Sequence, residues 1–191
     1  MFKPGAFVIS VLMAFASATS TAQNAPQLLK DMEGTWQVKQ RMWPSPGAQG
    51  VDLPPAIARR QLIDGKYLEE VMELAQGSAG QPESFRRNAF LNYNAVTKRY
   101  EYTSLDTRAP QLMTETSLRV DPKVIPIELK LQGGMFVAPE WGSAKNVPFK
   151  YRLTISRING GKQIVQLYLT PQKILPKKEF LAFEYVYSQR Q

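Results

Sequence analysis

The stretch Val-Pro-Phe-Lys-Tyr-Arg-Leu-Thr-Ile-Ser-Arg-Ile, residues 147–158, alternates apolar and polar side chains more cleanly than any other part of the sequence. Successive side chains of a β-strand point to opposite faces of the sheet. This stretch therefore predicts a strand with one buried and one solvated face. The expected buried residues are Phe149, Tyr151, Leu153 and Ile155, and the expected solvated residues are Lys150, Arg152, Thr154 and Ser156.

The same two-residue period recurs on both sides of this strand. We predict nine further strands, at residues 34–43, 56–63, 66–75, 85–93, 99–106, 111–120, 124–132, 163–170 and 179–190. Asp64-Gly65 supplies the positive φ angles of a tight hairpin turn between two of them. Longer loops are expected at residues 44–55, 76–84 and 133–146, where proline, glycine and serine gather.

These strands follow one another through mostly short turns, and only residues 27–33 favour a short helical turn. Ten meandering antiparallel strands can close into a cylinder, which removes exposed edges. We therefore predict an all-β fold, a single antiparallel up-and-down β-barrel of lipocalin-like type. A β-sandwich is the alternative, although sandwiches usually need longer Greek-key connections.

The N-terminal 22 residues resemble a secretory signal peptide. Lys3 is followed by an apolar run, residues 6–16, and then by small polar residues ending at Ala22. The apolar run is shorter than the roughly 20 residues that cross a bilayer. No cysteine follows it, so a lipidated cysteine anchor is excluded. We expect residues 23–191 to be the mature barrel domain, periplasmic or secreted and without a transmembrane segment.

The opening of the first predicted strand resembles the start of lipocalins and related calycin barrels. In those barrels a short helical turn precedes Gly-X-Trp, here Gly34-Thr35-Trp36. The resemblance implies that Trp36 plugs the closed end of the barrel. It also implies that a basic residue late in the chain packs over the tryptophan, and Arg190 is the candidate here.

The wider chain resembles a bacterial family known only as a domain of unknown function, number fifteen seventy-nine (DUF1579). The resemblance covers residues 28–44, 63–73, 90–106 and 183–190. One departure is Asn92-Tyr93-Asn94, where the family is expected to have Gly-Tyr-Asp, so any role of that aspartate is in doubt here. The resemblance implies a barrel and no established activity.

Composition excludes several kinds of site. The chain has no histidine and no cysteine. Triads that use an imidazole base, thiolate metal sites and histidine-ligated zinc, copper or haem therefore cannot be built. We expect no metal and no cofactor, although a haem held by tyrosine or methionine remains open. Export and the lack of a recognisable motif also disfavour a nucleic-acid partner.

Several polar residues fall on otherwise apolar faces of the predicted strands. We name Glu70, Arg87, Tyr102 and Asp106 as candidate ligand-orienting residues. A buried carboxylate is costly unless it is paired, so Glu70 and Arg87 on adjacent strands are expected to neutralise each other if both are internal. Thr114 and Thr116 are assigned to the apolar face that also carries Leu112 and Leu118.

Three functions are compatible with this pattern. The first is binding of a small hydrophobic or amphipathic molecule inside the barrel, which requires a cavity of roughly 300 Å³ or more. The second is an enzyme without imidazole, with Glu70 and Asp106 as an acid/base pair. The third is an interaction module for anionic envelope surfaces, in which the basic doublets gather on one face. The doublets are residues 59–60, 86–87, 98–99 and 177–178, in a chain of formal net charge +8.

Overall fold

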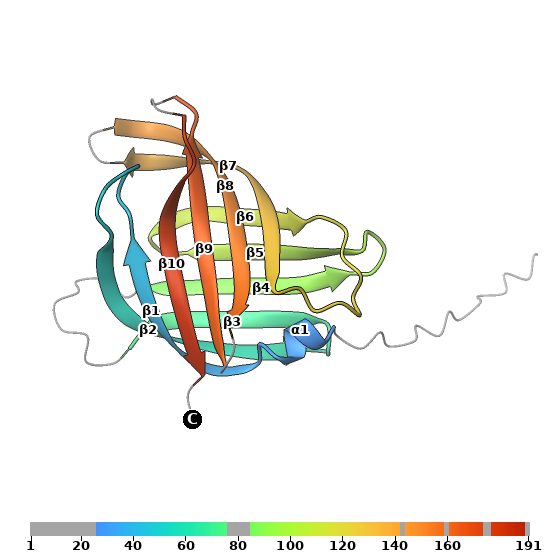
Figure 1. Cartoon of the computed structure of the whole chain (residues 1–191). Coiled ribbons are helices and arrows are strands. Elements are labelled where there is room, and N and C mark those ends of the chain that lie inside the picture. The colour runs from blue at the N-terminus through green and yellow to red at the C-terminus, as the bar shows by residue number, and fades with distance from the viewer. Residues whose placement is uncertain (1–25, 76–84, 142–143, 159–160, 174–176, 190–191) are drawn as a thin grey trace, which may run out of the picture.

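The computed structural model is a closed antiparallel barrel in which each strand pairs with its neighbours in the chain and the last strand pairs with the first (Figure 1). The structure describes residues 26–75, 85–141, 144–158, 161–173 and 177–189. In Figure 1, strands β8, β9 and β10 cross steeply in front of β4, β5 and β6. The predicted all-β, ten-strand barrel is confirmed, and the sandwich alternative is wrong.

The elements follow the predicted order with different bounds. They are α1 (Gln27–Lys30), β1 (Gly34–Met42), β2 (Val51–Ile63), β3 (Tyr67–Leu74), β4 (Arg86–Asn94), β5 (Arg99–Asp106), β6 (Ala109–Ser117), β7 (Glu128–Trp141), β8 (Ala144–Ile158), β9 (Lys162–Pro171) and β10 (Phe180–Gln189).

Two turns form as their residue types require. Asp64 and Gly65 have φ angles of 50° and 63° and join β2 to β3, as the Asp-Gly pair predicts. The β4–β5 turn is held by the side chain of Asn94, whose Oδ1 accepts hydrogen bonds from the backbone N–H groups of Val96 and Thr97. An asparagine therefore keeps the acceptor oxygen that an aspartate supplies in such a turn.

The short helix α1 packs against one end of the barrel. Leu28, Leu29 and Met32 are buried there together with Trp36 of β1. The indole Nε1 of Trp36 donates a hydrogen bond to the carbonyl oxygen of Met32 at 3.0 Å. Strands β1, β3, β5, β7 and β9 end at the opposite end of the barrel, which we call the mouth, and strands β2, β4, β6, β8 and β10 begin there.

Two predicted loops are wrong in part, because strands extend into both. β2 begins at Val51, and its Pro54 and Pro55 lie opposite a register shift in β1, where a missing N–H is tolerated. β7 continues through Gly133 and Gly134 to form a long hairpin with β8, and these glycines coincide with a register shift rather than a loop. Conversely, residues 124–127 precede β7 instead of belonging to it.

The wall between β6 and β7 is closed by side chains near the mouth. Their backbone ladder has three pairs, ending at Glu115↔Gly133. Beyond it, the Gln111 amide bonds to both the N–H and the carbonyl of Val137. The hydroxyl of Tyr151 on β8 bonds to the N–H and carbonyl of Thr114 at 3.0 and 3.1 Å. We call this region the β6–β7 seam.

The predicted orientation of β6 is wrong. Leu112 and Leu118 are 63% and 77% exposed, so the face that they share with Thr114 and Thr116 points outward. The inner face of β6 instead carries Met113 and Glu115. The neighbouring strand explains this, because inward Tyr102 and Ser104 of β5 pair with Glu115 and Met113, and paired residues share a face.

A substitution at Gly133 tests the β6–β7 seam. A Cβ atom at Gly133 would clash with the Tyr151 ring, whereas a Cβ at Gly134 meets nothing within 4 Å. We expect Gly133→Ala to displace the ring and destabilise the fold by about 2 kcal/mol, as overpacking does. Gly134→Ala is the control and should leave the free energy of unfolding within about 0.5 kcal/mol. Equal stability of the two variants in urea denaturation would contradict the role of the ring.

Candidate functional site

The barrel encloses a cavity of about 380 Å³ that opens toward the mouth. This volume exceeds the roughly 300 Å³ that a ligand-binding barrel requires. Most of the wall is apolar, and the larger apolar residues that line it are Met42, Leu53, Leu74, Phe85, Met113, Phe136, Leu153, Leu167, Leu169 and Phe183. We call this space the barrel cavity.

A buried ion network lies on the inner side of the barrel cavity. Arg60 Nε contacts Glu70 Oε2 at 2.6 Å, and Arg87 Nη2 contacts Glu70 Oε1 at 2.5 Å. The hydroxyl of Tyr187 accepts from Arg87 Nη2 at 2.7 Å, and Gln163 Oε1 accepts from Arg60 Nη1 at 2.7 Å. All three charged side chains are at most 7% exposed, so these contacts form away from solvent.

Aromatic rings hold the two guanidinium groups of this network in place. Arg60 lies 4.1 Å from the ring centre of Tyr187 and 5.6 Å from that of Trp36. Arg87 lies 4.6 Å from the ring centre of Tyr185. Cation–π contacts of desolvated guanidiniums stabilise by about 1–2 kcal/mol. The network therefore fills the barrel between the cavity and the α1 end, where a residual space of only about 20 Å³ remains.

Burial alone raises the pKa of Glu70, but the nearby charges of Arg60 and Arg87 outweigh it and lower the pKa to about 2. Glu70 is therefore ionised at neutral pH. Its pKa is depressed in the folded state, so its contribution to stability is present above about pH 4.5 and is lost as the pH falls toward about 2.

Two further charged residues lie where the cavity meets the mouth. Arg108 Nη2 contacts Asp106 Oδ2 at 2.8 Å, and the guanidinium lies 4.0 Å from the ring centre of Phe85. The Arg108 side chain is 34% exposed and the Asp106 side chain 17%. Solvent therefore reaches this pair, and the opposite charges of Arg108 and Asp106 balance each other.

Sequence reasoning missed Glu115, because it assigned the wrong face of β6 to the interior. Glu115 is 3% exposed and lines the barrel cavity. Its Oε2 is buried without a hydrogen-bond partner among the described residues. Burial raises the pKa of Glu115 to about 8, and Arg87 offsets this only in part. The carboxyl group is therefore mostly protonated at neutral pH. The sequence signal that could have found Glu115 is the inward orientation of Tyr102 and Ser104 on the neighbouring strand β5, because paired residues share a face.

The candidate residues named from sequence divide between two places. Asp106 lines the barrel cavity, Glu70 lines the small space on the α1 side of the network, and Arg87 and Tyr102 lie between the two and line both. Glu70 and Asp106 therefore do not face one cavity, and each is paired with a guanidinium. This arrangement gives no support to an acid/base pair of these two carboxylates.

Of the two predicted closed-end residues, Trp36 lies among the described residues. Trp36 is 2% exposed and lies where α1 covers the barrel. Arg190 lies outside the described residues, so its contact with Trp36 stays a prediction. Arg60 is a guanidinium that the structure does place over the Trp36 ring.

The basic doublets do not form one patch. Strand alternation buries Arg60 and Arg87, while their neighbours Arg59 and Arg86 lie outside and contact Glu73 at 3.2 and 3.8 Å. Residues 98–99 adjoin the β4–β5 turn at the α1 end, and residues 177–178 precede β10 at the mouth. The positions of these doublets therefore give little support to a polyanion-binding surface.

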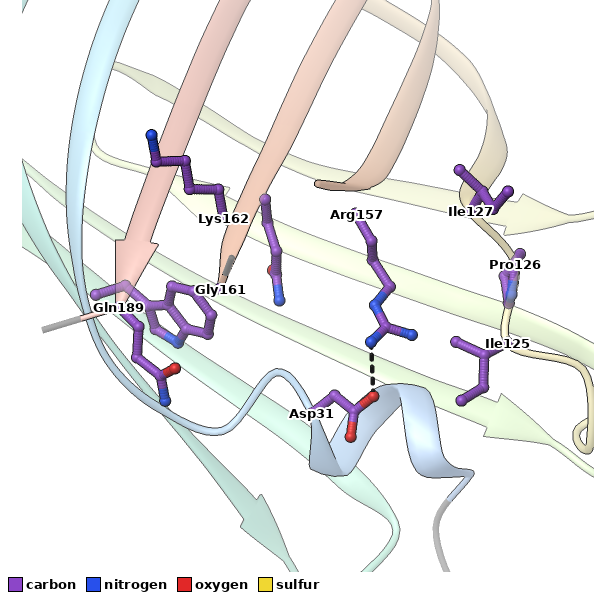
Figure 2. A pocket seen from close by; sticks show the side chains of 10 residues that line it. Asp31, Ile125, Pro126, Ile127, Arg157, Gly161, Lys162 and Gln189 are labelled. Carbon is purple, nitrogen blue, oxygen red and sulfur yellow. Dashed lines mark hydrogen bonds and ion pairs between the residues drawn. The ribbon is translucent and has the colours of Figure 1, made fainter. Parts of the chain in front are cut away.

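A second hollow, of about 760 Å³, lies beside α1 (Figure 2). Asp31 and Arg157 face each other in it at 2.9 Å, and Ile127 on its rim is 81% exposed. Its volume exceeds that of the barrel cavity, but it is an open surface depression whose charged pair is already satisfied. The barrel cavity is the better candidate site because walls from all around the barrel enclose it.

Among the described residues, no group of three or more histidine, cysteine, aspartate or glutamate side chains is gathered in a way that could hold a metal ion. No helix in the same ranges has the length and apolar character needed to cross a membrane.

Comparison with known proteins places the chain in a family. The model described as "Protein of unknown function (DUF1579)" matches residues 21–152. The chain belongs to this DUF1579 family. The resemblance seen in the sequence is thereby confirmed.

A solved structure shares the fold of this DUF1579 member. The crystal structure of Rv2717c from M. tuberculosis matches with a TM-score of 0.59 and 14% identity, over 88% of this chain and 100% of that chain. At this identity the similarity concerns the fold alone. A comparison with curated proteins finds no match.

The ion network of this DUF1579 member can be tested through two glutamates of β3. Glu70→Gln leaves two buried guanidiniums without a counter-charge, and we expect a loss of about 3 kcal/mol in the free energy of unfolding. The control is Glu73→Gln, because Glu73 is 41% exposed and pairs with Arg59 and Arg86 at the surface. The loss in free energy of unfolding caused by Glu73→Gln should stay below about 1 kcal/mol. Equal losses in chemical denaturation would show that the network contributes no more than a surface pair.

The raised pKa of Glu115 predicts a specific dependence of stability on pH. The folded state binds this proton more tightly than the unfolded state, so the stabilisation is complete below about pH 4.5 and lost as the pH rises to about 8. The slope is at most about 1.4 kcal/mol per pH unit. We expect Glu115→Gln to remove this part of the slope. Denaturation curves measured across this range check it, and identical slopes in both proteins would overturn the assignment.

Proposed function

We propose that this protein binds a small hydrophobic or amphipathic molecule inside the barrel cavity. The observation that carries the proposal is an enclosed space of about 380 Å³ with apolar walls and a few polar groups, Arg87, Tyr102, Ser104 and Glu115 among them, on its inner side. Small-molecule sites commonly combine apolar walls with a few convergent polar groups. The volume lies near the lower end of the usual range, which favours a small ligand.

The walls and the polar groups have different roles in this proposal. Burial of apolar ligand surface against Leu153, Leu167 and Phe183 supplies affinity at about 25 cal/mol per Å² of area removed from water, before the cost of association. The inward polar groups then orient the ligand. Arg87 is held by Glu70 and Tyr187, so little side-chain freedom remains to be lost on binding.

A pair of tryptophan substitutions on β6 tests the location of binding. Met113 lines the cavity, and the adjacent Leu112 points outward. We expect Met113→Trp to fill the cavity and weaken binding of the neutral fluorescent probe N-phenylnaphthylamine by about tenfold or more. Leu112→Trp should leave the affinity unchanged. Fluorescence titration measures both, and equal affinities of the two variants would place the probe elsewhere.

We also propose that the protein acts outside the cytoplasm after removal of residues 1–22. These residues lie outside the described part of the chain, and the proposal rests on the signal-peptide pattern of Lys3, the apolar run and Ala22. The intact mass of the protein purified from a periplasmic or secreted fraction tests it. The expected mass is that of residues 23–191, with cleavage within a few residues of Ala22.

A further inference from the structure

The described interior holds more positive than negative charge. The buried charged residues are Arg60, Glu70, Arg87 and Glu115. Glu70 is the one carboxylate that both guanidiniums share. Glu115 is largely protonated at neutral pH, since burial raises its pKa to about 8. The network therefore carries an excess of one positive charge at neutral pH, and an uncompensated buried charge is costly.

Part of the excess charge borders the barrel cavity. Arg87 lines both this cavity and the small space on the α1 side, whereas Arg60 lines only the small space. Arg87 Nη2 is used by Glu70 and Tyr187, but Arg87 Nε is buried without a hydrogen-bond partner among the described residues. Because the side chain is only 6% exposed, this donor is closed off from bulk solvent.

A second unpartnered atom belongs to the same cavity. The buried side-chain atoms without a partner in the described ranges are Arg87 Nε, Tyr100 Oη, Glu115 Oε2 and Thr154 Oγ1. Of these residues, only Arg87 and Glu115 line the barrel cavity. A guanidinium N–H donates, and a protonated carboxyl O–H also donates. Two residues that each hold an unpartnered buried donor, one of them part of the network with excess positive charge, thus line a cavity with apolar walls.

We infer that the ligand is an amphiphile with a single anionic carboxylate, which accepts hydrogen bonds from Arg87 Nε and Glu115 while its apolar chain lies along the cavity walls toward the mouth. The two oxygens of a carboxylate match the two donors, and its charge balances the excess guanidinium. This inference rests on the proposed function and names its ligand class.

The inference includes a dependence on pH. Ionised Glu115 neutralises the excess charge of Arg87, ceases to donate and repels the ligand carboxylate. The other titratable side chains around the cavity are Tyr102 and Asp106 on β5, Arg108 in the β5–β6 turn, Glu140 on β7 and Tyr185 on β10, with Tyr151 of β8 in the β6–β7 seam. Glu115 couples directly to Arg87, so its ionisation changes the charge that the ligand meets.

The test compares decanoate with decanol, which have the same chain and differ in head-group charge. Both compete with N-phenylnaphthylamine in a fluorescence titration of the full chain at about pH 6, where decanoate is ionised and Glu115 is not. We expect decanoate to bind at least about tenfold more tightly than decanol. Arg87→Gln, which leaves the Arg60–Glu70 pair balanced, should abolish this preference, so that decanoate binds no more tightly than decanol.

A second set of measurements, made on the wild-type protein as a function of pH, tests the inference even if Arg87→Gln does not fold. Between about pH 6 and about pH 9.5, decanoate affinity should fall by about tenfold or more in the wild-type protein, while decanol affinity stays constant and reports an intact cavity. Glu115→Gln should flatten the dependence of decanoate affinity on pH.

The outcomes separate the two proposals. Equal affinity for decanoate and decanol, or a decanoate affinity that does not depend on pH in the wild-type protein, would overturn the carboxylate inference and leave cavity binding standing. If neither compound displaces the probe and the probe itself does not bind, the proposed function fails and the inference fails with it.

Discussion

The barrel depends on how it accommodates Glu70 between Arg60 and Arg87. The three charges lie on adjacent strands β2, β3 and β4, and Tyr187 and Gln163 from β10 and β9 add hydrogen bonds from across the interior. One network therefore links strands on opposite sides of the cylinder. Ion networks of this kind cost desolvation energy and are not in themselves a source of high stability. What this network supplies is a fixed polar boundary, with an α1-capped apolar core on one side and a cavity on the other.

The same ion network therefore sets both the charge at the inner side of the cavity and the position where the cavity ends. Apolar side chains at the positions of Arg60, Glu70 and Arg87 would extend the core with no charged boundary. The guanidinium pair instead gives the inner side of the cavity a fixed positive charge, held by the rings of Trp36, Tyr185 and Tyr187. Arg108 and Asp106 near the mouth balance each other, so the field inside the cavity comes mainly from the network.

Most of the fold could be predicted from the sequence, because a half-buried strand shows its two faces directly in its residues. The inward positions of Glu70, Arg87 and Tyr102 follow from alternation alone, and Asp64-Gly65 fixes the register of its hairpin. The pattern failed on β6, where leucine is exposed at 112 and 118 while Met113 and Glu115 point inward. There the pairing with β5 decides the orientation, and intrinsic hydrophobicity does not. Glu115 was missed for this reason. The extent of the cavity was also beyond prediction, since it depends on how side chains from all ten strands fill the interior.

The β6–β7 seam gives the cylinder an uneven wall. The other neighbouring strands share longer backbone ladders, but past Glu115 the Gln111 amide joins β6 to β7, and the Tyr151 hydroxyl joins β6 to β8. Side chains change rotamer in picoseconds to nanoseconds when they are free to move, whereas strand separation is a slower cooperative event. Widening at this seam thus requires the rearrangement of two side chains rather than the unzipping of a strand pair. β6 and β7 share the shortest backbone ladder of the neighbouring strand pairs, so beyond Glu115 the closure of the barrel wall depends on side chains.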